Sequence, residues 1–186
     1  MDYVAPYIAG LKTTLDQMDQ TPIHDMIEAL HHARENGRKV FIMGNGGSAS
    51  TASHFVCDLA KNTRHADWPD FRVVGLTDNM ALMTAYANDE GYDQVFSQQL
   101  ASLIYPDDVV IGISTSGNSD NVLRAIEEAK KHPGVITIGL TGFDAGQLGD
   151  MVDIHVHVPS DCIEYVEDIH LVLEHLITKA LREMVN

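Results

Sequence analysis

From Lys39 onward the chain alternates short apolar runs with segments of helical periodicity, and this alternation restricts the fold more than any other feature. Strands that are apolar along their whole length are typical of a parallel sheet covered by helices on both faces. The sequence therefore predicts an α/β domain, a three-layer α/β/α sandwich around a five-stranded parallel sheet. The predicted strands are Val40 to Met43, Arg72 to Leu76, Val109 to Ile113, Val135 to Leu140 and Asp153 to Val158. The predicted helices are Ser48 to Ala60, Asn79 to Ala87, Gln94 to Leu103, Ser119 to His132 and Ile163 to Met184.

Two more helices are predicted ahead of this sheet. Apolar residues from Val4 to Met18 recur at steps of three and four, which places them along one stripe of a helix. Thr21-Pro22 is typical of a helix start and Asn36-Gly37 of a helix end. We expect residues 1–37 to form an antiparallel helical hairpin and residues 38–186 to form the α/β core with a C-terminal helix, together one domain over 1–186.

The charge and the cysteine content exclude several classes of protein. The chain has 12 Lys and Arg against 27 Asp and Glu, a net charge of −15, which argues against a nucleic-acid partner held by a basic surface. No apolar run is long enough to cross a membrane, and the N-terminus lacks the order of a secretory signal. Cys57 and Cys162 are far apart and fit no disulfide framework. We expect a soluble, cytoplasmic protein with reduced thiols and no membrane partner.

A glycine-rich turn follows the first predicted strand. The strand runs into Gly44-Asn45-Gly46-Gly47-Ser48, after which the chain becomes helical. Glycines let the backbone approach a ligand closely, and a helix start presents amide donors and a positive dipole end to an anion. The same turn also suits a dinucleotide fold, or a tight turn without any ligand, so it does not identify the ligand alone.

A second loop strengthens the case for an anion. The strand Val109 to Ile113 enters Ser114-Thr115-Ser116-Gly117-Asn118-Ser119, so four hydroxyl side chains gather at the start of the next helix. Ser119 alone would suffice as a helix cap. The three additional hydroxyls indicate phosphate, because uncharged donors at a helix start can hold phosphate oxygens without Arg or Lys.

Two acidic and two histidine side chains are candidates for a metal site. His54 and Asp58 lie four residues apart on the helix after the glycine turn, so both can face one ligand, and imidazole and carboxylate both bind zinc. A polar pair on a solvated helix face is the alternative. Glu167 and His175 are eight residues apart, about 12 Å along a straight helix, so they must converge from separate turns or from different subunits.

The helix that carries Glu167 and His175 offers two other candidates. A small error in its rotation would make His170 or Glu174 the ligand instead. The remaining histidines lack comparable neighbours and are interpreted as surface or structural residues.

Three segments resemble the successive motifs of the phosphoheptose isomerases, a family within the sugar isomerase (SIS) superfamily. They are GNGGSAS at 44–50, TAYANDEGY at 84–92 and GISTSGNSDNVL at 112–123, and the likeness extends over nearly the whole chain. The resemblance implies the SIS fold, which is flavodoxin-like, and a homotetramer with sites between subunits. It also implies an aldose-ketose isomerase that converts sedoheptulose 7-phosphate to D-glycero-D-manno-heptose 7-phosphate through an enediol.

The resemblance further implies roles for single residues. The sugar would contact Asn45, Gly46, Gly47, Asn88, Asp89 and Glu167. The phosphate would be held by Ser48, Ser114, Thr115, Ser116 and Ser119. One zinc ion would be bound by His54, Asp58, Glu167 and His175. Asp58 would act as the base and His175 as the acid.

Two positions depart from the family pattern. The family usually has Glu where Asp58 stands and Gln where Glu167 stands. The shorter aspartate withdraws the base by one methylene, and small displacements can cost orders of magnitude in rate. A non-catalytic SIS protein that senses a phosphosugar or binds a protein partner is therefore an alternative, as is an isomerase of another sugar phosphate.

A dinucleotide-binding oxidoreductase is the third alternative. The glycine turn and Asp78 after the second strand would suit it. The G-x-G-x-x-G order is not met, however, because GNGGSAS lacks the third glycine, and the hydroxyl-rich loop would have no role.

Overall fold

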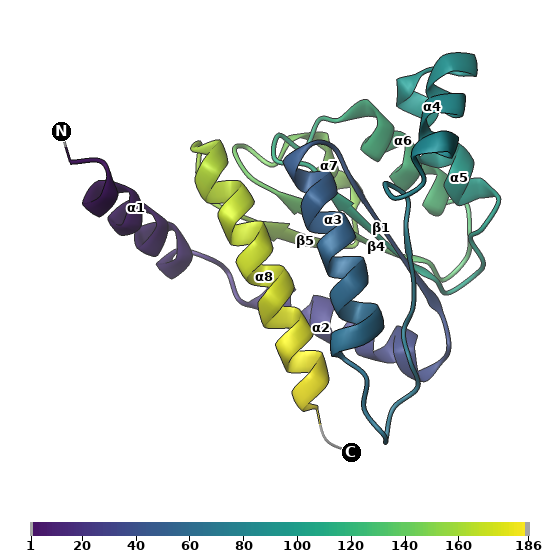
Figure 1. Cartoon of the computed structure of the whole chain (residues 1–186), viewed down its shortest axis with the longest axis horizontal. Coiled ribbons are helices and arrows are strands. Elements are labelled where there is room, and N and C mark those ends of the chain that lie inside the picture. The colour runs from purple at the N-terminus through teal and green to yellow at the C-terminus, as the bar shows by residue number, and fades with distance from the viewer. Residues whose placement is uncertain (1, 185–186) are drawn as a thin grey trace.

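The computed structural model describes residues 2–184 and contains one parallel five-stranded sheet (Figure 1). Its strands are β1 (Lys39–Gly44), β2 (Arg72–Gly75), β3 (Val109–Ile113), β4 (Ile136–Thr141) and β5 (Ile154–His157). They lie in the order β2-β1-β3-β4-β5, which is the flavodoxin-like order of a doubly wound sheet. The predicted fold class is confirmed, and each predicted strand agrees with the observed one to within a residue at either end.

Helices connect and flank the strands. They are α1 (Val4–Asp16), α2 (Thr21–Glu35), α3 (Gly47–Cys57), α4 (Met80–Asp89), α5 (Ser97–Ala101), α6 (Asp120–Ala129), α7 (Gly146–Met151) and α8 (Ile163–Glu183). A π-turn, Asp58–Asn62, follows α3 directly, and a 3-10 turn, Tyr92–Gln94, precedes α5. The predicted helix from Ser48 to Ala60 is therefore an α-helix that widens at its end, and the one from Gln94 to Leu103 is a shorter helix that begins at Ser97.

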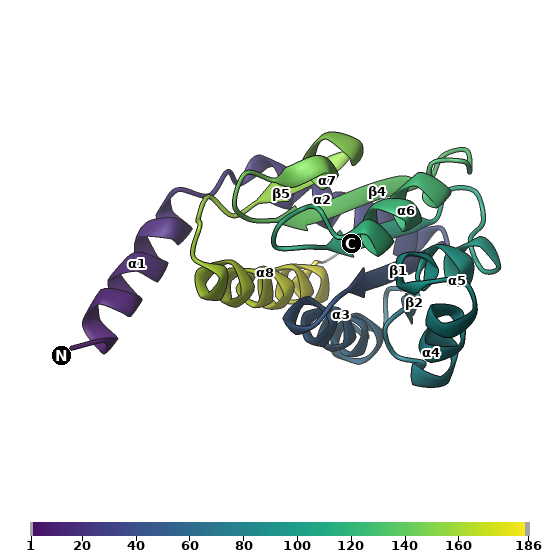
Figure 2. The same ribbon diagram turned by 90° about the horizontal axis from the view of Figure 1, so that it is seen from above.

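The core has one half on each face of the sheet. Side chains alternate along β1, so that Val40 and Ile42 pack with α2, α3 and α8, whereas Phe41 and Met43 pack with α5, α6 and α7. Both sets are buried, which explains why the strands read as continuous apolar runs. Figure 2 shows α3 and α8 side by side, and in Figure 1 both run in the same direction.

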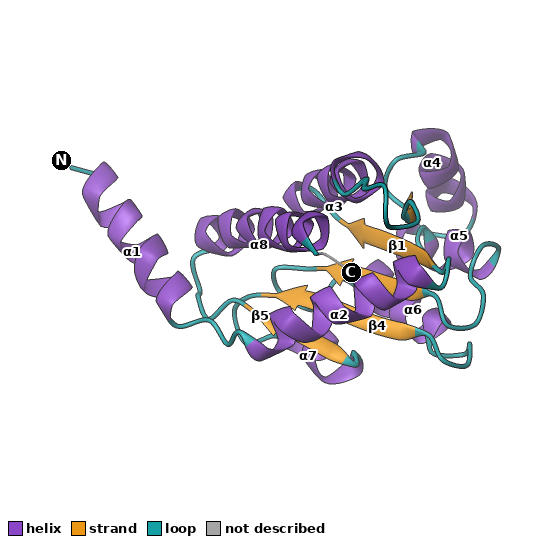
Figure 3. Ribbon diagram, turned by 90° about the horizontal axis from the view of Figure 1, so that it is seen from below, coloured by secondary structure: helices purple, strands orange, loops and turns teal. Residues whose placement is uncertain are grey.

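The first helix departs from the prediction, because α1 and α2 do not form an antiparallel hairpin. α1 extends away from the rest of the chain (Figure 3) and contacts the start of α8, where Tyr7 donates a hydrogen bond to Asp168 and packs against Tyr165. The apolar face of α2 is already used, since Met26 and Leu30 are buried against the sheet layer. α2 is thus committed to the sheet layer, and α1 packs mainly on the start of α8.

Between residues 2 and 184 the structure contains no helix of the length and apolar character that a membrane span requires.

Candidate active site

The two loops singled out in the sequence meet at one edge of the sheet. β1 and β3 are adjacent and parallel, with Gly44 beside Ile113 at their carboxyl ends. The strand order reverses here, because the chain passes from β1 outward to β2 on one side and from β3 to β4 on the other. In doubly wound sheets this switch point opens a crevice in which ligands bind.

An amide pair joins the two loops across this crevice. Asn45 Nδ2 donates to Asn121 Oδ1 at 2.8 Å, and Asn121 Nδ2 donates to Asn45 Oδ1 at 2.9 Å. The Tyr92 hydroxyl also donates to Asn45 Oδ1, at 2.8 Å. These three residues line a pocket of about 310 Å³ together with Asp93, Ser119 and Asp120. The bridge fixes the spacing of the two loops.

The start of α6 is left open to an anion. Ser119 occupies the N-cap position, but its side chain caps no amide of the helix, since its Oγ lies 3.0 Å from Ser114 Oγ instead. The first-turn amides of α6 therefore have no side-chain acceptor among the residues described. Free amides and a positive dipole end are what a phosphate binds at a helix start.

The hydroxyl-rich loop is held in shape by the segment that follows β4. Gly142 N donates to Thr115 O at 2.8 Å, and Leu148 N donates to Gly117 O at 2.9 Å. Asn118 Oδ1 accepts from Gln147 N at 3.1 Å. These bonds fix the backbone of the loop before a ligand arrives.

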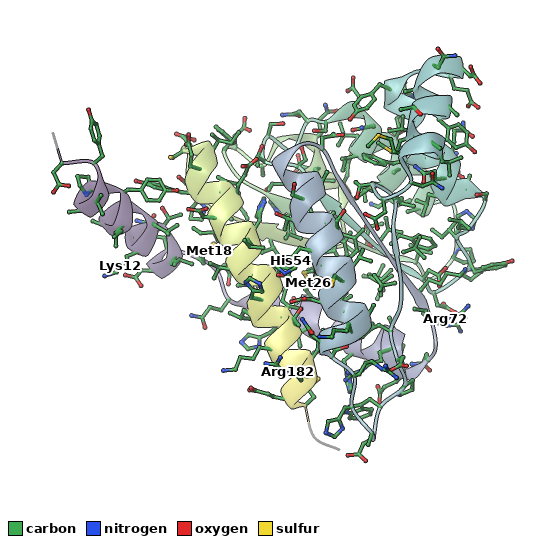
Figure 4. The ribbon with its side chains drawn as sticks, in the orientation of Figure 1. Lys12, Met18, Met26, His54, Arg72 and Arg182 are labelled. Atoms are coloured by element: carbon green, nitrogen blue, oxygen red, sulfur yellow. The ribbon has the colours of Figure 1, made fainter. Side chains whose placement is uncertain are left out.

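A carboxylate-imidazole cluster lies between α3 and α8, where Figure 4 labels His54. It consists of His54, Asp58, Glu174 and His175, each of which offers a ligand atom within 4.8 Å of the others. His54 Nε2 is 3.7 Å from Asp58 Oδ1, and His175 Nε2 is 3.4 Å from Glu174 Oε2. The two imidazole rings are 5.0 Å apart. Histidine and carboxylate together are a donor set for zinc.

The acidic members of this cluster are buried, whereas the two histidines are exposed. Burial and the neighbouring charge of Asp58 raise the pKa of Glu174 to about 7, although His175 opposes this shift. Glu174 Oε2 accepts no hydrogen bond among the described residues. Two buried carboxylates with an unsatisfied oxygen fit a divalent cation, which would supply the missing partner.

The single π-helical turn after α3 holds the Asp58 carboxylate by a hydrogen bond. Asp58 is its first residue and Asn62 its last, and Asn62 Nδ2 donates to Asp58 Oδ1 at 2.6 Å. π-turns are rare and are frequent at functional sites. The shorter side chain of Asp58 is thus held by a specific amide.

The structure brings together three of the four predicted metal ligands, namely His54, Asp58 and His175. Glu167 lies elsewhere, against Gly47 at the start of α3, where an added Cβ would come within 2.5 Å of Glu167 Oε1. In one chain, Glu174 takes the fourth place in the cluster.

Two other predicted residues are less closely tied to the crevice. Asn88 donates to Asp89, and both are exposed at the end of α4, with no hydrogen bond to either loop among the residues described. Their role toward the sugar stays a prediction.

His170, the other alternative on α8, is a buried structural residue. Burial lowers its pKa to about 4, and its Nε2 lies 3.3 Å from the Thr141 carbonyl oxygen, to which a neutral ring donates.

Two residues of the site were missed in the sequence, and a third, Glu174, was only an alternative there. Asn121 and Tyr92 each lie within a quoted motif, but the motif assigned them no role, and their contacts follow only from the switch-point geometry. Glu174 did carry a signal, because it falls on the same helical stripe as Ile169, Leu173 and Ile177, all of which are buried. A charged residue among buried apolar positions of a helix is almost always paired with an opposite charge or a metal ion.

Comparison with known proteins agrees with this geometry. Residues 3–142 match the family model of the SIS domain. The chain is 39% identical to the phosphoheptose isomerase of Helicobacter pylori over 164 residues, covering 88% of this chain and 82% of that protein. It is 40% identical to the probable phosphoheptose isomerase of Thermoplasma acidophilum over 156 residues, covering 84% and 85%.

A solved structure extends the likeness to the whole architecture. The phosphoheptose isomerase of Neisseria gonorrhoeae superposes with a TM-score of 0.88 at 30% identity, covering 97% of each chain. The match includes α8 and therefore the half of the cluster that lies beyond the SIS domain model. The chain thus belongs to the SIS domain family and, within it, to the phosphoheptose isomerases.

Proposed function

We propose that this protein is an aldose-ketose isomerase that converts sedoheptulose 7-phosphate to D-glycero-D-manno-heptose 7-phosphate through an enediol. The observation that carries the proposal is that α3 begins at the phosphate crevice and carries His54 two turns further on, with Asp58 directly after its last residue. The family membership supports the same reaction.

The distance between the two parts of the site restricts the substrate. His54 is seven residues after Gly47, about 10 Å along the helix axis. A ligand that reaches both ends must carry its phosphate far from its reacting carbons. An open-chain sugar phosphorylated at its last carbon meets this requirement.

The phosphate is held at the helix starts. Ser114, Thr115, Ser116 and Ser119 supply hydroxyl donors beside the uncapped amides of α6, and Ser48 lies in the first turn of α3. The sugar lies next to the phosphate, in contact with Asn45, Gly46 and Gly47. Glu167 faces the sugar from α8. Such uncharged donors bind the dianion despite the net charge of −15, because the attraction is local.

Proton transfer is assigned to Asp58 and His175. Asp58 takes the proton from the carbon next to the carbonyl, the electron pair moves onto the carbonyl oxygen, and that oxygen takes up a proton to give the enediol. His175 then donates a proton to the former carbonyl carbon, while the hydroxyl on the adjacent carbon releases its proton to form the new carbonyl. Burial of Asp58 and its bond from Asn62 fix the base relative to the substrate. Zinc held by His54, Asp58, His175 and one further carboxylate would supply a Lewis acid for the carbonyl, which would join the ion as an additional ligand.

Turnover of sedoheptulose 7-phosphate tests the proposal. Metal-replete protein is incubated with the ketose, and NMR follows the appearance of the aldose, with Asp58→Asn as the matched inactive control. A panel of pentose and hexose phosphates is run alongside. Tight phosphosugar binding without any turnover would instead support a non-catalytic sensor, an alternative that the shorter Asp58 favours.

We also infer that the protein self-associates as a homotetramer. The apolar stripe of α1 is exposed, with Val4 at 68% and Ile8 at 47%, and α8 exposes Leu176 at 45%. Exposed apolar helix faces of this kind support an interface between copies of the chain. Sedimentation analysis tests the state, and cell fractionation tests the predicted cytoplasmic location.

A further inference from the structure

We propose that Glu174, a residue the sequence motifs do not single out, is the second carboxylate ligand of the metal ion, in the place predicted for Glu167. The proposal rests on the proposed function, which calls for a divalent cation at this cluster. It concerns which side chains of this chain hold the ion.

The surroundings of Glu174 provide the first argument. The residue is 1% exposed, and its Oε2 accepts no hydrogen bond among the described residues. Oε1 accepts a long bond from Thr178 Oγ1, at 3.4 Å. Buried polar atoms in proteins nearly always have a partner, and an unpartnered carboxylate oxygen is costly. The free oxygen is directed at the cluster, where His175 Nε2 lies 3.4 Å away.

The distances provide the second argument. Zinc bonds of about 2.0–2.1 Å in a tetrahedral site separate neighbouring ligand atoms by roughly 3.3–3.4 Å. The His175–Glu174 pair at 3.4 Å and the His54–Asp58 pair at 3.7 Å are close to that spacing. The two pairs come from α8 and α3, so they face each other as opposite edges of a tetrahedron would.

Charge provides the third argument. Asp58 and Glu174 would both be anionic when bound to an ion, and no described Lys or Arg forms an ion pair with either. Two carboxylates balance a divalent cation, whereas without one they repel each other. Burial of both groups makes that balance more important, because water screens them little.

Glu167 is poorly placed for the same task within one chain. Its carboxylate lies against Gly47, which precedes His54 by seven residues, or about 10 Å of helix. At that position it faces the sugar crevice.

Metal affinity of two matched variants tests the inference. Glu174→Gln and Glu167→Gln each remove one charge and keep the side-chain shape. Zinc affinity is measured by competition with a chromophoric chelator, and the absorption spectrum of bound Co²⁺ reports the ligand set. We expect Glu174→Gln to weaken zinc binding by at least tenfold and to change the Co²⁺ spectrum, with Glu167→Gln like the parent protein. The reverse pattern, or equal effects, overturns the inference.

Two further measurements separate this inference from the proposed function. Thermal melts of the metal-free proteins check that both variants fold, and Glu174→Asp gives a second variant, which should bind zinc more weakly because its carboxylate is withdrawn. Isomerase turnover is recorded independently. Absence of turnover with the expected metal pattern would refute the proposed function alone, whereas turnover that survives with unchanged zinc binding in Glu174→Gln would refute the inference alone.

Discussion

Replacing Gly117 by alanine should damage the phosphate loop far more than its size suggests. Gly117 has φ +65°, and an added Cβ would overlap the carbonyl oxygen of Ala145. Two costs result. An L residue in the left-handed region costs about 1–2 kcal/mol. The overlap is with backbone, so no rotamer change relieves it, and the segment after β4 that braces the loop must move.

Gly37 offers a matched control, because it isolates the first cost. Its φ is +62°, and an added Cβ would meet nothing within 4 Å. For a chain of this length about 2–4 °C of melting temperature corresponds to 1 kcal/mol. Gly37→Ala should therefore lower the melting temperature by about 2–8 °C, and Gly117→Ala by clearly more.

Calorimetry with a phosphosugar completes the test. Gly37→Ala should keep the parent dissociation constant, since its turn lies at the opposite end of β1. Gly117→Ala should weaken binding by at least tenfold, because displaced hydroxyls and amides no longer converge on the phosphate. Equal melting temperatures and equal dissociation constants for the two variants would refute the view that the braced loop holds the ligand.

Three other predictions concern the bridge, the buried histidine and the metal. Asn45→Ala removes two hydrogen bonds to Asn121 and one from Tyr92, and it should raise the phosphosugar dissociation constant by more than Tyr92→Phe, which removes one; calorimetry ranks the two. The pKa of His170 is lowered to about 4 from 6.5, so the unfolded chain binds more protons between these values, and up to about 3 kcal/mol of stability is lost as the pH falls through that window. The pKa of Glu174 is raised to about 7 from 4.5, so its effect on stability is opposite: stability is lost as the pH rises from 4.5 to 7. In metal-free protein the two effects oppose each other, so the fall in stability toward low pH caused by His170 should be seen only in Glu174→Gln. A stability of Glu174→Gln that does not change with pH would contradict this assignment. Chelation with EDTA should lower the melting temperature, by roughly 5–10 °C if the ion was present at 100 times its dissociation constant, and an unchanged melt would speak against a bound ion.

The strands and both ligand loops could be predicted because their signals are local. β3 has the predicted bounds, Val109 to Ile113, because an apolar run that ends at a polar loop defines both ends of the strand. α7 was missed, because it is only six residues long and contains Gly146 and Gly149, which weaken any helical pattern.

The parts that depend on tertiary contacts could not be predicted in the same way. The apolar stripe of α1 was visible, but its partner was not, because periodicity shows which face is apolar and not what covers it. The choice among Glu167, His170 and Glu174 depends on how α8 is rotated against α3. That rotation follows from the packing of the whole apolar stripe against the sheet layer.

The π-turn after α3 has a consequence for changes in chain length. Up to Asp58 the helix keeps α geometry, so the spacing of His54 and Asp58 is independent of what comes later. The exposed connection from Arg64 to Asp70 begins just beyond the turn. Surface loops tolerate insertions and deletions. His54 and Asp58 both precede this connection, so a change in its length should leave their spacing on the helix unchanged.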